Sequence, residues 1–480
     1  MKQSGTIAMR PPRSPSRPDP PAEESNGTLA EMGWRPLLRA ASLTGFAGLA
    51  SGVLAALATK IFAMMLGPAE LAVLATLQQI RQAGLTVSTL NGQTALIQGL
   101  SARIARERRE FLRTVLLLMT GATTVVMAAA WTFAGWLART AGLATEHVPL
   151  IRWLAVPVAL SCALVFLSAV LGARGAIGPL GLAQLASPGA MAILAYPLAR
   201  AVRPGQEGAF VVWIGAAALV AVAAALAVLL RQRIRHWFRG DGEWWSPPAA
   251  RGFLTVSGAM LASGGVASLV LLAARARILH QQGFAVGGQF DAAWAISMNH
   301  VSLLLGSLQA YCLPIMARSP DRAERSAHLT RMLTSAALAA AAVVCAIALL
   351  KPLILTLLYS GAFRDAARYL RWTLIGDYFK VAGWVLSIPM LASADMRSFL
   401  TADLGAYLVF AGGTVAAAHY RGAAEGTAIA FVLMCTAHVG ITGTIAWRRY
   451  GFRPGQWTSL IWLAGLVVII AVSTATWRQV

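Results

Sequence analysis

Acidic residues are scarce in this sequence, and so are charged residues of either sign. Asp and Glu number 19 against 40 Lys and Arg in 480 residues, which gives a formal net charge of +21. Charged residues make up 12% of the chain and hydrophobic residues 57%, and the mean hydropathy is +0.64. A soluble domain of this length could not bury so much apolar surface in its core. The composition therefore predicts a polytopic membrane protein.

Cysteine and histidine are also rare, and neither is spaced as metal ligands are. None of the seven histidines belongs to a His-x-x-x-His pair. The four cysteines each fall within an apolar segment, where we expect small hydrophobic residues: Cys162, Cys312, Cys345 and Cys435. The sequence also lacks a Gly-rich phosphate loop and a nucleophile elbow. We therefore predict no metal, no cofactor, no catalytic residue and no enzymatic activity.

Thirteen apolar segments long enough to span a bilayer as helices follow a polar amino-terminal stretch. They are approximately Ala41–Leu66, Leu71–Leu100, Phe111–Ala138, Pro149–Leu171, Pro179–Ala199, Ala209–Leu230, Phe253–Ala274, Ala285–Met316, Leu329–Tyr359, Ala366–Ala392, Phe399–Ala418, Thr427–Trp447 and Trp457–Trp477. The predicted fold is an all-α membrane protein with two six-helix lobes and one extra carboxyl-terminal transmembrane helix. We predict a disordered cytoplasmic tail at 1–38, the first lobe at 39–230, a cytoplasmic linker at 231–251, the second lobe at 252–449 and the extra segment at 450–480.

Basic residues gather in alternate connections between these segments. The clusters follow the second, sixth, eighth and twelfth segments, at Arg103, Arg106, Arg108 and Arg109; Arg231, Arg233, Arg235 and Arg239; Arg318, Arg322 and Arg325; and Arg448, Arg449 and Arg453. The positive-inside rule places such connections, and hence the amino terminus, in the cytoplasm. Because no aromatic residues interleave with them to form a basic groove, we expect no nucleic-acid partner.

Two charges of opposite sign lie midway through the apolar segment Ala366–Ala392. Asp377 and Lys380 are three residues apart and therefore share a helix face. Each costs roughly 2.5–3.5 kcal/mol at the centre of a membrane helix, so such residues normally face a protein interior or a watery cavity. Asp377 is either a structural counter-ion for Lys380 or a neighbouring Arg, or a carboxylate whose protonation alternates with the transport cycle. Asp291, in Ala285–Met316, is a weaker candidate for the same role.

Five cationic side chains lie within or near the predicted extracytoplasmic halves of their helices: Lys60, Arg81, Arg275, Arg277 and Lys380. An isolated charge there would meet hydrocarbon. We predict that these residues line a cationic substrate-binding cavity. The alternative is that Lys60, Arg275 and Arg277 only extend their long side chains to the membrane interface.

The second apolar segment carries an unusual number of polar side chains. If Leu71–Leu100 is one helix, Gln78, Gln82 and Gln93 fall roughly on one face. Amide groups on one face suit the hydroxyls of a sugar, so we predict that these residues bind substrate. The alternative is hydrogen bonding between helices, which polar side chains commonly provide in membranes.

Several motifs together resemble one known family. They are Ser360-x-x-Phe363 with Trp372-x-Leu374-x-Gly376-Asp377-x-x-Lys380-Val381, Tyr311-x-Leu313-Pro314 with Arg318, and Lys60-x-x-Ala63 with Gly67-Pro68-Ala69. This set resembles O-antigen translocases of the Wzx type, including flippases for lipid-linked enterobacterial common antigen, from about Ala40 to Arg449. The chain departs from the family at Glu70, where Gly is frequent, and at Thr94–Ser101, which lacks the usual Lys or Arg.

The resemblance implies the multidrug/oligosaccharidyl-lipid/polysaccharide exporter fold, with two lobes around a central cavity in a bacterial inner membrane. It implies a flippase that turns an undecaprenyl-pyrophosphate-linked oligosaccharide from the cytoplasmic to the periplasmic leaflet. Expected partners are this lipid, the bilayer, a coupling ion and the polysaccharide polymerase and assembly proteins. The alternatives are an ion-coupled multidrug antiporter of the same superfamily, a membrane-embedded glycosyltransferase or polymerase, and a scaffold that transports nothing.

Overall fold

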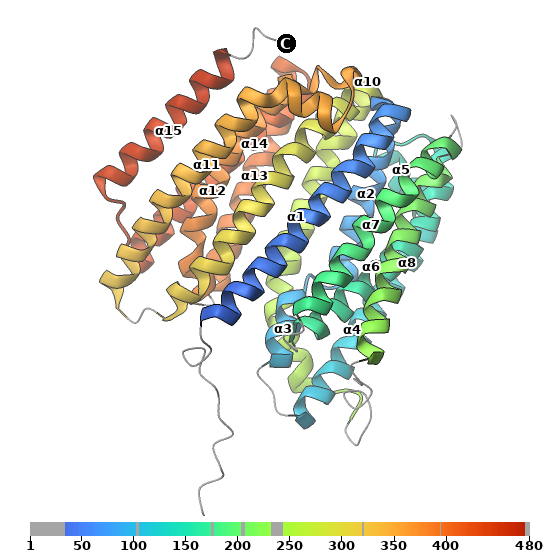
Figure 1. Ribbon diagram of the computed structural model, residues 1–480, viewed down its shortest axis with the longest axis horizontal. Coiled ribbons are helices and arrows are strands. Elements are labelled where there is room, and N and C mark those ends of the chain that lie inside the picture. Colours follow the sequence, from blue (N-terminus) through green and yellow to red (C-terminus); the bar gives the residue numbers. More distant parts are fainter. Residues whose placement is uncertain are drawn as a thin grey trace, which may run out of the picture.

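The computed structural model describes residues 34–101, 105–173, 177–202, 207–231, 243–318, 321–393 and 395–475. Within these ranges the chain forms helices and no strand, and the helices run alongside one another in one bundle (Figure 1). They are α1 (Trp34–Met65), α2 (Pro68–Ser88), α3 (Gln93–Ser101), α4 (Ala105–Thr132), α5 (Ala134–Thr140), η1 (Thr145–His147), α6 (Val148–Ala173), α7 (Ile177–Ala201), α8 (Gly208–Arg231), α10 (Pro247–Arg318), α11 (Arg322–Leu358), η2 (Gly361–Phe363), α12 (Ala366–Ala392), α13 (Met396–Arg421), α14 (Ala423–Tyr450) and α15 (Gln456–Ala475). The predicted all-α membrane fold is confirmed.

Ten helices in the described ranges are long and apolar enough to cross a membrane, against thirteen predicted segments. One difference is α10, which is counted as one helix although it contains two predicted segments on either side of Gly283. A second is α1, whose described apolar part is Ala50–Met65. The third is α2, which carries Gln78, Gln79 and Arg81 and is less apolar than the ten.

Some of the predictions concern parts of the chain that the structure does not describe. They are the tail up to residue 33, the linker from 232 to 242 and the side chains of Tyr311, Leu313, Pro314 and Arg318. The boundaries of the two lobes stay predictions.

The long helix α10 is a hairpin of two antiparallel halves. Along a straight helix Arg275 and Asp291 would lie about 24 Å apart, at roughly 1.5 Å per residue. Their side chains instead form a salt bridge, with Arg275 Nε 2.8 Å from Asp291 Oδ1. The chain reverses at Gly283, whose φ of 82° is a conformation that glycine adopts without a Cβ clash. The two halves are therefore two separate helical segments, which correspond to the two predicted apolar segments.

The predicted segment Leu71–Leu100 is not one continuous helix. The helix ends after Ser88 and restarts at Gln93, because Leu90 and Asn91 adopt left-handed φ values of 51° and 46°. Asn tolerates this conformation better than most residues, and its side-chain Nδ2 donates to Met260 O on α10 at 2.7 Å. Polar contact with another helix has overridden the apolar pattern that favoured one continuous helix.

The extra helix α15 lies at the outer edge of the bundle (Figure 1). Its Trp462 Nε1 donates to Leu333 O on α11 at 3.1 Å, and its Trp462 O accepts from Tyr378 on α12 at 3.2 Å. Thr458 on α15 also shares a hydrogen bond with Thr334 on α11, at 3.0 Å. These bonds attach α15 to α11 and α12, and α15 is one of the ten candidate spans.

The contact between α2 and the second half of α10 is too tight for any side chain at one position. A Cβ on Gly288 would lie 1.8 Å from the backbone oxygen of Pro68. Because backbone cannot rotate away, we expect Gly288→Ala to lower the free energy of unfolding by about 1–3 kcal/mol. Thermal unfolding of the detergent-purified protein measures this loss. The matched control is Gly265→Ala on the same helix, where a Cβ meets no atom within 4 Å; equal melting temperatures for the two variants would contradict the prediction.

Candidate functional site

Asp377 is fully buried in the middle of α12 and faces the second half of α10. Its exposed fraction is 0%. The hydroxyl of Ser297 donates to both carboxylate oxygens, at 2.9 Å and 2.7 Å. The ring of His300 lies beside the same group, with Nε2 3.4 Å from Asp377 Oδ2. Ser297 and His300 are three residues apart on α10, so they present one face to Asp377.

The geometry of His300 constrains where protons sit in this cluster. Its Nδ1 lies 2.9 Å from Ile296 O, an acceptor, so Nδ1 carries a hydrogen. In neutral imidazole the other nitrogen, Nε2, then presents a lone pair, and it makes no hydrogen bond within the described part of the chain. A lone pair facing an ionised carboxylate is unfavourable. One proton on either group relieves that repulsion, so Asp377 and His300 form a site suited to holding and releasing a single proton.

Lys380 does not pair directly with Asp377, and the predicted ion pair is wrong in that respect. Both side chains are described, and the structure has no contact of 4.0 Å or less between their charged atoms. The Lys380 ammonium instead lies 3.3 Å from Met298 Sδ and 5.7 Å from the centre of the Phe431 ring. Both charges nevertheless face α10, as their spacing predicted. Asp377 contacts Ser297 and Lys380 contacts Met298, which is the next residue on α10.

Arg275 and Asp291 form a second buried charged group, between the two halves of α10. Their side chains are 11% and 9% exposed. Arg275 Nη1 also donates to Gln79 Oε1 on α2, at 3.0 Å. Arg275 therefore does not extend to an interface. The group joins α2 of the first predicted lobe to α10 of the second.

A cavity of about 120 Å³ lies next to this charged group. Its polar lining comes from Thr59 on α1, Gln78 on α2, Asp291 on α10 and Tyr359 after α11. Gln78, a predicted substrate-binding residue, and Asp291, a predicted coupling carboxylate, therefore share one cavity, and their roles stay predictions. The cavity is small, so a large cargo needs the helices to separate.

Lys60 joins α1 to the end of α11. Its Nζ donates to the backbone oxygens of Thr356, at 2.5 Å, and of Tyr359. The hydroxyl of Ser360 donates to Ala63 O at 3.4 Å. The last carbonyls of a helix lack partners within the helix and carry partial negative charge, so a cation there is stabilising. Lys60 thus closes the space between the two predicted lobes at this end of the bundle.

We expect Lys60→Met to open this end, because the variant keeps the apolar stem and removes the donors. A hydrogen bond from a charged group contributes about 1.5–3 kcal/mol, so the closed population relative to the open one should fall at least tenfold. Spin labels at Leu57 and Leu353, both exposed, in a cysteine-free background report the distance between α1 and α11. Lys60→Arg is the control that keeps the donors. Identical distance distributions for wild type and Lys60→Met would contradict the prediction.

The remaining predicted residues do not gather around these groups. Arg81 Nη1 donates to Ser161 Oγ on α6 at 3.2 Å, a contact within the first predicted lobe. Arg277 is two residues from Arg275 and therefore points to nearly the opposite side of the helix. Its Nε is buried without a hydrogen-bond partner in the described part of the chain. Gln82 is exposed, and Gln93 is exposed on α3. The predicted common face of Gln78, Gln82 and Gln93 is wrong because the helix ends between the second and third.

Two further polar groups were not predicted as site residues from the sequence. Glu425 at the start of α14 is 2% exposed and accepts from Arg368, Arg371 and Trp372 of α12. Asp403 on α13 accepts from the hydroxyl of Ser263 and lies 3.5 Å from His438 Nε2. Each acid stands near a helix end, where a solvated charge is the ordinary expectation. Only the packing of distant helices identifies their partners.

Comparison with known proteins gives partial sequence similarity. No family model matches the chain. It is 24% identical to the lipid III flippase of Escherichia coli (strain K12) over 165 residues, which are 34% of this chain and 39% of that protein. The lipid III flippase of Shigella flexneri matches with the same figures. The similarity thus spans 39% of the length of these curated relatives.

Similarity to solved structures extends over almost the whole chain. An inward-facing multidrug resistance MATE family transporter of the MOP superfamily aligns with a TM-score of 0.64 and 17% identity, covering 88% of this chain and 95% of that one. The lipid II flippase MurJ in an inward closed conformation aligns with a TM-score of 0.64 and 13% identity, covering 92% and 99%. The MATE multidrug transporter DinF-BH gives 0.67 and 14%, covering 88% and 97%. The chain therefore has the fold that MATE transporters of the MOP superfamily share with the lipid II flippase MurJ.

Proposed function

We propose that this protein is a flippase that moves an undecaprenyl-pyrophosphate-linked oligosaccharide, an O-antigen or related surface-polysaccharide unit, from the cytoplasmic to the periplasmic leaflet. The main support is that sequence similarity to lipid III flippases coincides with fold similarity to a lipid II flippase. Both names denote flippases, which favours a lipid-borne cargo. The motifs around Asp377 and Lys380 extend this to the Wzx type.

The charged group between the predicted lobes supplies the chemistry that such a cargo needs. A pyrophosphate requires cations, and the sugars require hydrogen-bonding groups. Gln78 lines the small cavity. Lys60 and Arg275 each bind a residue that lines it, Tyr359 and Asp291, and Gln79 accepts from Arg275. When the lobes separate, Lys60 loses its carbonyl partners at the end of α11 and Arg275 loses Gln79 on α2 while keeping Asp291, so donors of both cations become free to bind phosphate oxygens. The protein binds and reorients the lipid without making or breaking a covalent bond.

The buried Asp377–His300 pair supports a proton as the coupling ion. The pair accommodates one proton, and Lys380 lies on the same face of α12. Transfer of this proton changes the charge buried against the second half of α10. Each conformation of the two lobes then stabilises one charge state of the Asp377–His300 pair. Binding and release of the proton therefore shift the protein between the two conformations of alternating access.

The proposal places the protein in a bacterial inner membrane with a cytoplasmic amino terminus. The arginine clusters between alternate segments support this orientation. In this setting the polysaccharide polymerase and assembly proteins receive the translocated lipid.

A multidrug antiporter is the second candidate, and the fold similarity to MATE transporters favours it. Against it stands the charge around the cavity: Asp291 lines it but is paired with Arg275, and Lys60 adds a further cation on the lining residue Tyr359. A net positive surrounding suits anionic cargo better than the cationic compounds that an acidic cavity would attract.

The test is deletion of the gene followed by complementation. Flippase function predicts that deletion causes undecaprenyl-linked oligosaccharide to accumulate and surface polymer to disappear, and that wild type restores both. The Lys60→Met variant, which lacks one proposed phosphate donor, should restore polymer less than Lys60→Arg. Unchanged precursor and polymer in a strain without a redundant translocase would overturn the proposal, and drug sensitivity of the same strain would then support the antiporter.

A further inference from the structure

The chain turns between α2 and α3 through residues in an unfavourable backbone conformation. We call Leu90–Gly92 the α2–α3 corner. Leu90 and Asn91 have φ values of 51° and 46°. Asn adopts this conformation fairly readily, but a bulky residue such as Leu is an outlier there because its Cβ crowds the following carbonyl oxygen. The apolar run that contains the corner would fit one straight helix without this strain, so a contact outside α2 and α3 must hold the corner bent.

That contact is with the first half of α10. Asn91 Nδ2 donates to Met260 O at 2.7 Å. A Cβ on Gly92 would lie 2.3 Å from Cζ of Phe253, and a Cβ on Gly264 would lie 2.7 Å from Asn91 Nδ2. Glycine at both positions therefore allows the corner and α10 to approach this closely. Since the corner belongs to the first predicted lobe and α10 to the second, a contact between the lobes maintains the strain.

The same contact leaves a buried hydroxyl without a partner. Ser257 on α10 is 0% exposed, and its Cβ would lie 3.2 Å from a Cβ on Gly92. Its Oγ makes no hydrogen bond within the described part of the chain. A buried polar group without a partner is unfavourable, and water would satisfy this hydroxyl if the corner left α10. The bent corner thus carries two local penalties, one in the backbone and one in a side chain.

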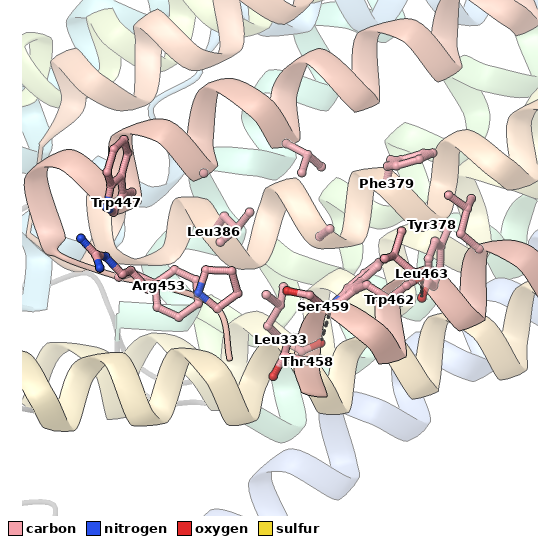
Figure 2. Close-up of a pocket in the computed structure, with 16 residues that line it drawn as sticks. Leu333, Tyr378, Phe379, Leu386, Trp447, Arg453, Thr458, Ser459, Trp462 and Leu463 are labelled. Carbon is pink, nitrogen blue, oxygen red and sulfur yellow. Dashed lines mark hydrogen bonds between the residues drawn. The ribbon is translucent and has the colours of Figure 1, made fainter. Parts of the chain in front are cut away.

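The corner and Lys60 lie at opposite ends of the bundle (Figure 1). Helix α2 begins near the Lys60 contact, and its 21 residues span roughly 30 Å before the corner. The arginine cluster that follows α3 in the sequence places the corner end in the cytoplasm. A cavity of about 710 Å³ beside α15 does not reach this contact, because α11, α12, α14, α15 and the connection before α15 line it (Figure 2). Opening the corner end therefore requires the helices themselves to move.

We propose that the α2–α3 corner is a hinge that gates the cytoplasmic end of the transport path. The corner is bent while it packs on α10, and it straightens toward one continuous helix when the two separate. The strain at Leu90 and the unpaired Ser257 favour opening, whereas the Asn91 bond and the packing of Gly92 on Phe253 favour closure. This opposition keeps the two states close in free energy, as alternating access requires. The inference rests on the proposed function only through alternating access, which both candidate functions use.

The reactivity of a buried position measures how often the hinge opens. In a background without native cysteines, the Ser257→Cys variant should react with a water-soluble maleimide only when the corner has left α10. The control is a protein that keeps only the native Cys435, which is 1% exposed in the core of the second predicted lobe and should stay unreactive. Both proteins are labelled in detergent, without cargo.

Two substitutions at neighbouring positions should change this reactivity in opposite directions. Leu90→Gly removes the strain of the bent state, because glycine adopts a left-handed φ readily, and should slow labelling roughly five- to thirtyfold. Asn91→Ala removes the bond to Met260 and should speed labelling roughly two- to tenfold. The matched control is Thr94→Ala, an exposed position on α3 that should leave the rate unchanged. A general loosening of the fold would raise the rate in both variants.

A clash and its relief give a second, independent test. In the Gly92→Ala variant the new methyl group meets the Phe253 ring, so the corner should stay away from α10 and labelling should rise at least tenfold. Adding Phe253→Leu removes the ring and should reverse most of that rise.

The hinge would be overturned if Leu90→Gly and Asn91→Ala shifted the rate in the same direction or not at all. It would also be overturned if the Ser257→Cys protein transported normally and never reacted. Labelling as expected in a protein that moves no lipid-linked oligosaccharide would support the hinge and contradict only the flippase proposal.

Discussion

Asp377→Asn removes at least nine-tenths of transport while the protein still folds. The amide has the shape of the carboxylate and still accepts from Ser297, so we expect a melting temperature near that of wild type. It cannot hold the proton that the geometry of His300 places between the two groups. The measurement is the rate of flipping of a fluorescent lipid-linked oligosaccharide in proteoliposomes with an imposed pH gradient, beside precursor accumulation in complemented cells.

The control for this variant is Asp365→Asn, which removes an exposed carboxylate just before the same helix. It should transport normally. His300→Gln should resemble Asp377→Asn and make transport insensitive to the pH gradient, because both variants remove one half of the proton site. Transport that keeps its full rate and its dependence on the gradient in either variant would remove the proton from the mechanism.

Asp291→Ala destabilises the fold by about 3–5 kcal/mol, the largest loss of stability that we expect of a single substitution here. The change leaves the Arg275 guanidinium buried without its carboxylate, and an unpaired buried charge is far more costly than a missing pair. Removing both partners, in Arg275→Met with Asp291→Ala, should restore more than half of the loss. Thermal unfolding of the four proteins completes a double-mutant cycle.

Glu146→Ala is the control for this cycle, since its side chain is exposed and should change the free energy of unfolding by less than about 0.5 kcal/mol. If the loss of unfolding free energy in the double variant equalled the sum of the losses in the two single variants, the interaction between Arg275 and Asp291 would contribute nothing to stability. The stabilising role of the group that joins α2 to α10 would then lie in packing alone.

The helices could be predicted from the sequence because apolar runs of membrane length are a strong signal. Segments such as Ala366–Ala392 and Phe399–Ala418 agree with α12 and α13 closely. The turn at Gly283 was predictable as a gap between two apolar runs. The interruption of α2 was not, since Leu90 and Asn91 take left-handed conformations that depend on a bond to α10.

The candidate site was predictable only in part. Asp377, Arg275 and Asp291 stand out because a charge within an apolar run needs a partner. The partners themselves belong to helices far away in sequence. Ser297 and His300 are ordinary polar residues in the sequence, and the three-residue spacing between them is the one signal that could have placed both on a common face. The spacing of Asp377 and Lys380 suggested a direct pair, whereas each side chain meets a different residue of α10.

The second half of α10 carries residues of both buried charged groups on one uninterrupted helix. Asp291, which holds Arg275, precedes His300, which faces Asp377, by nine residues or about 14 Å of helix. A helical rod of this length is stiff, so its two ends cannot shift independently. Any axial displacement of this helix that follows a change of charge at His300 therefore also displaces Asp291 and strains its salt bridge with Arg275. The same rod would convey force in the reverse direction, so that parting α2 from α10 would alter how readily Asp377 and His300 share their hydrogen.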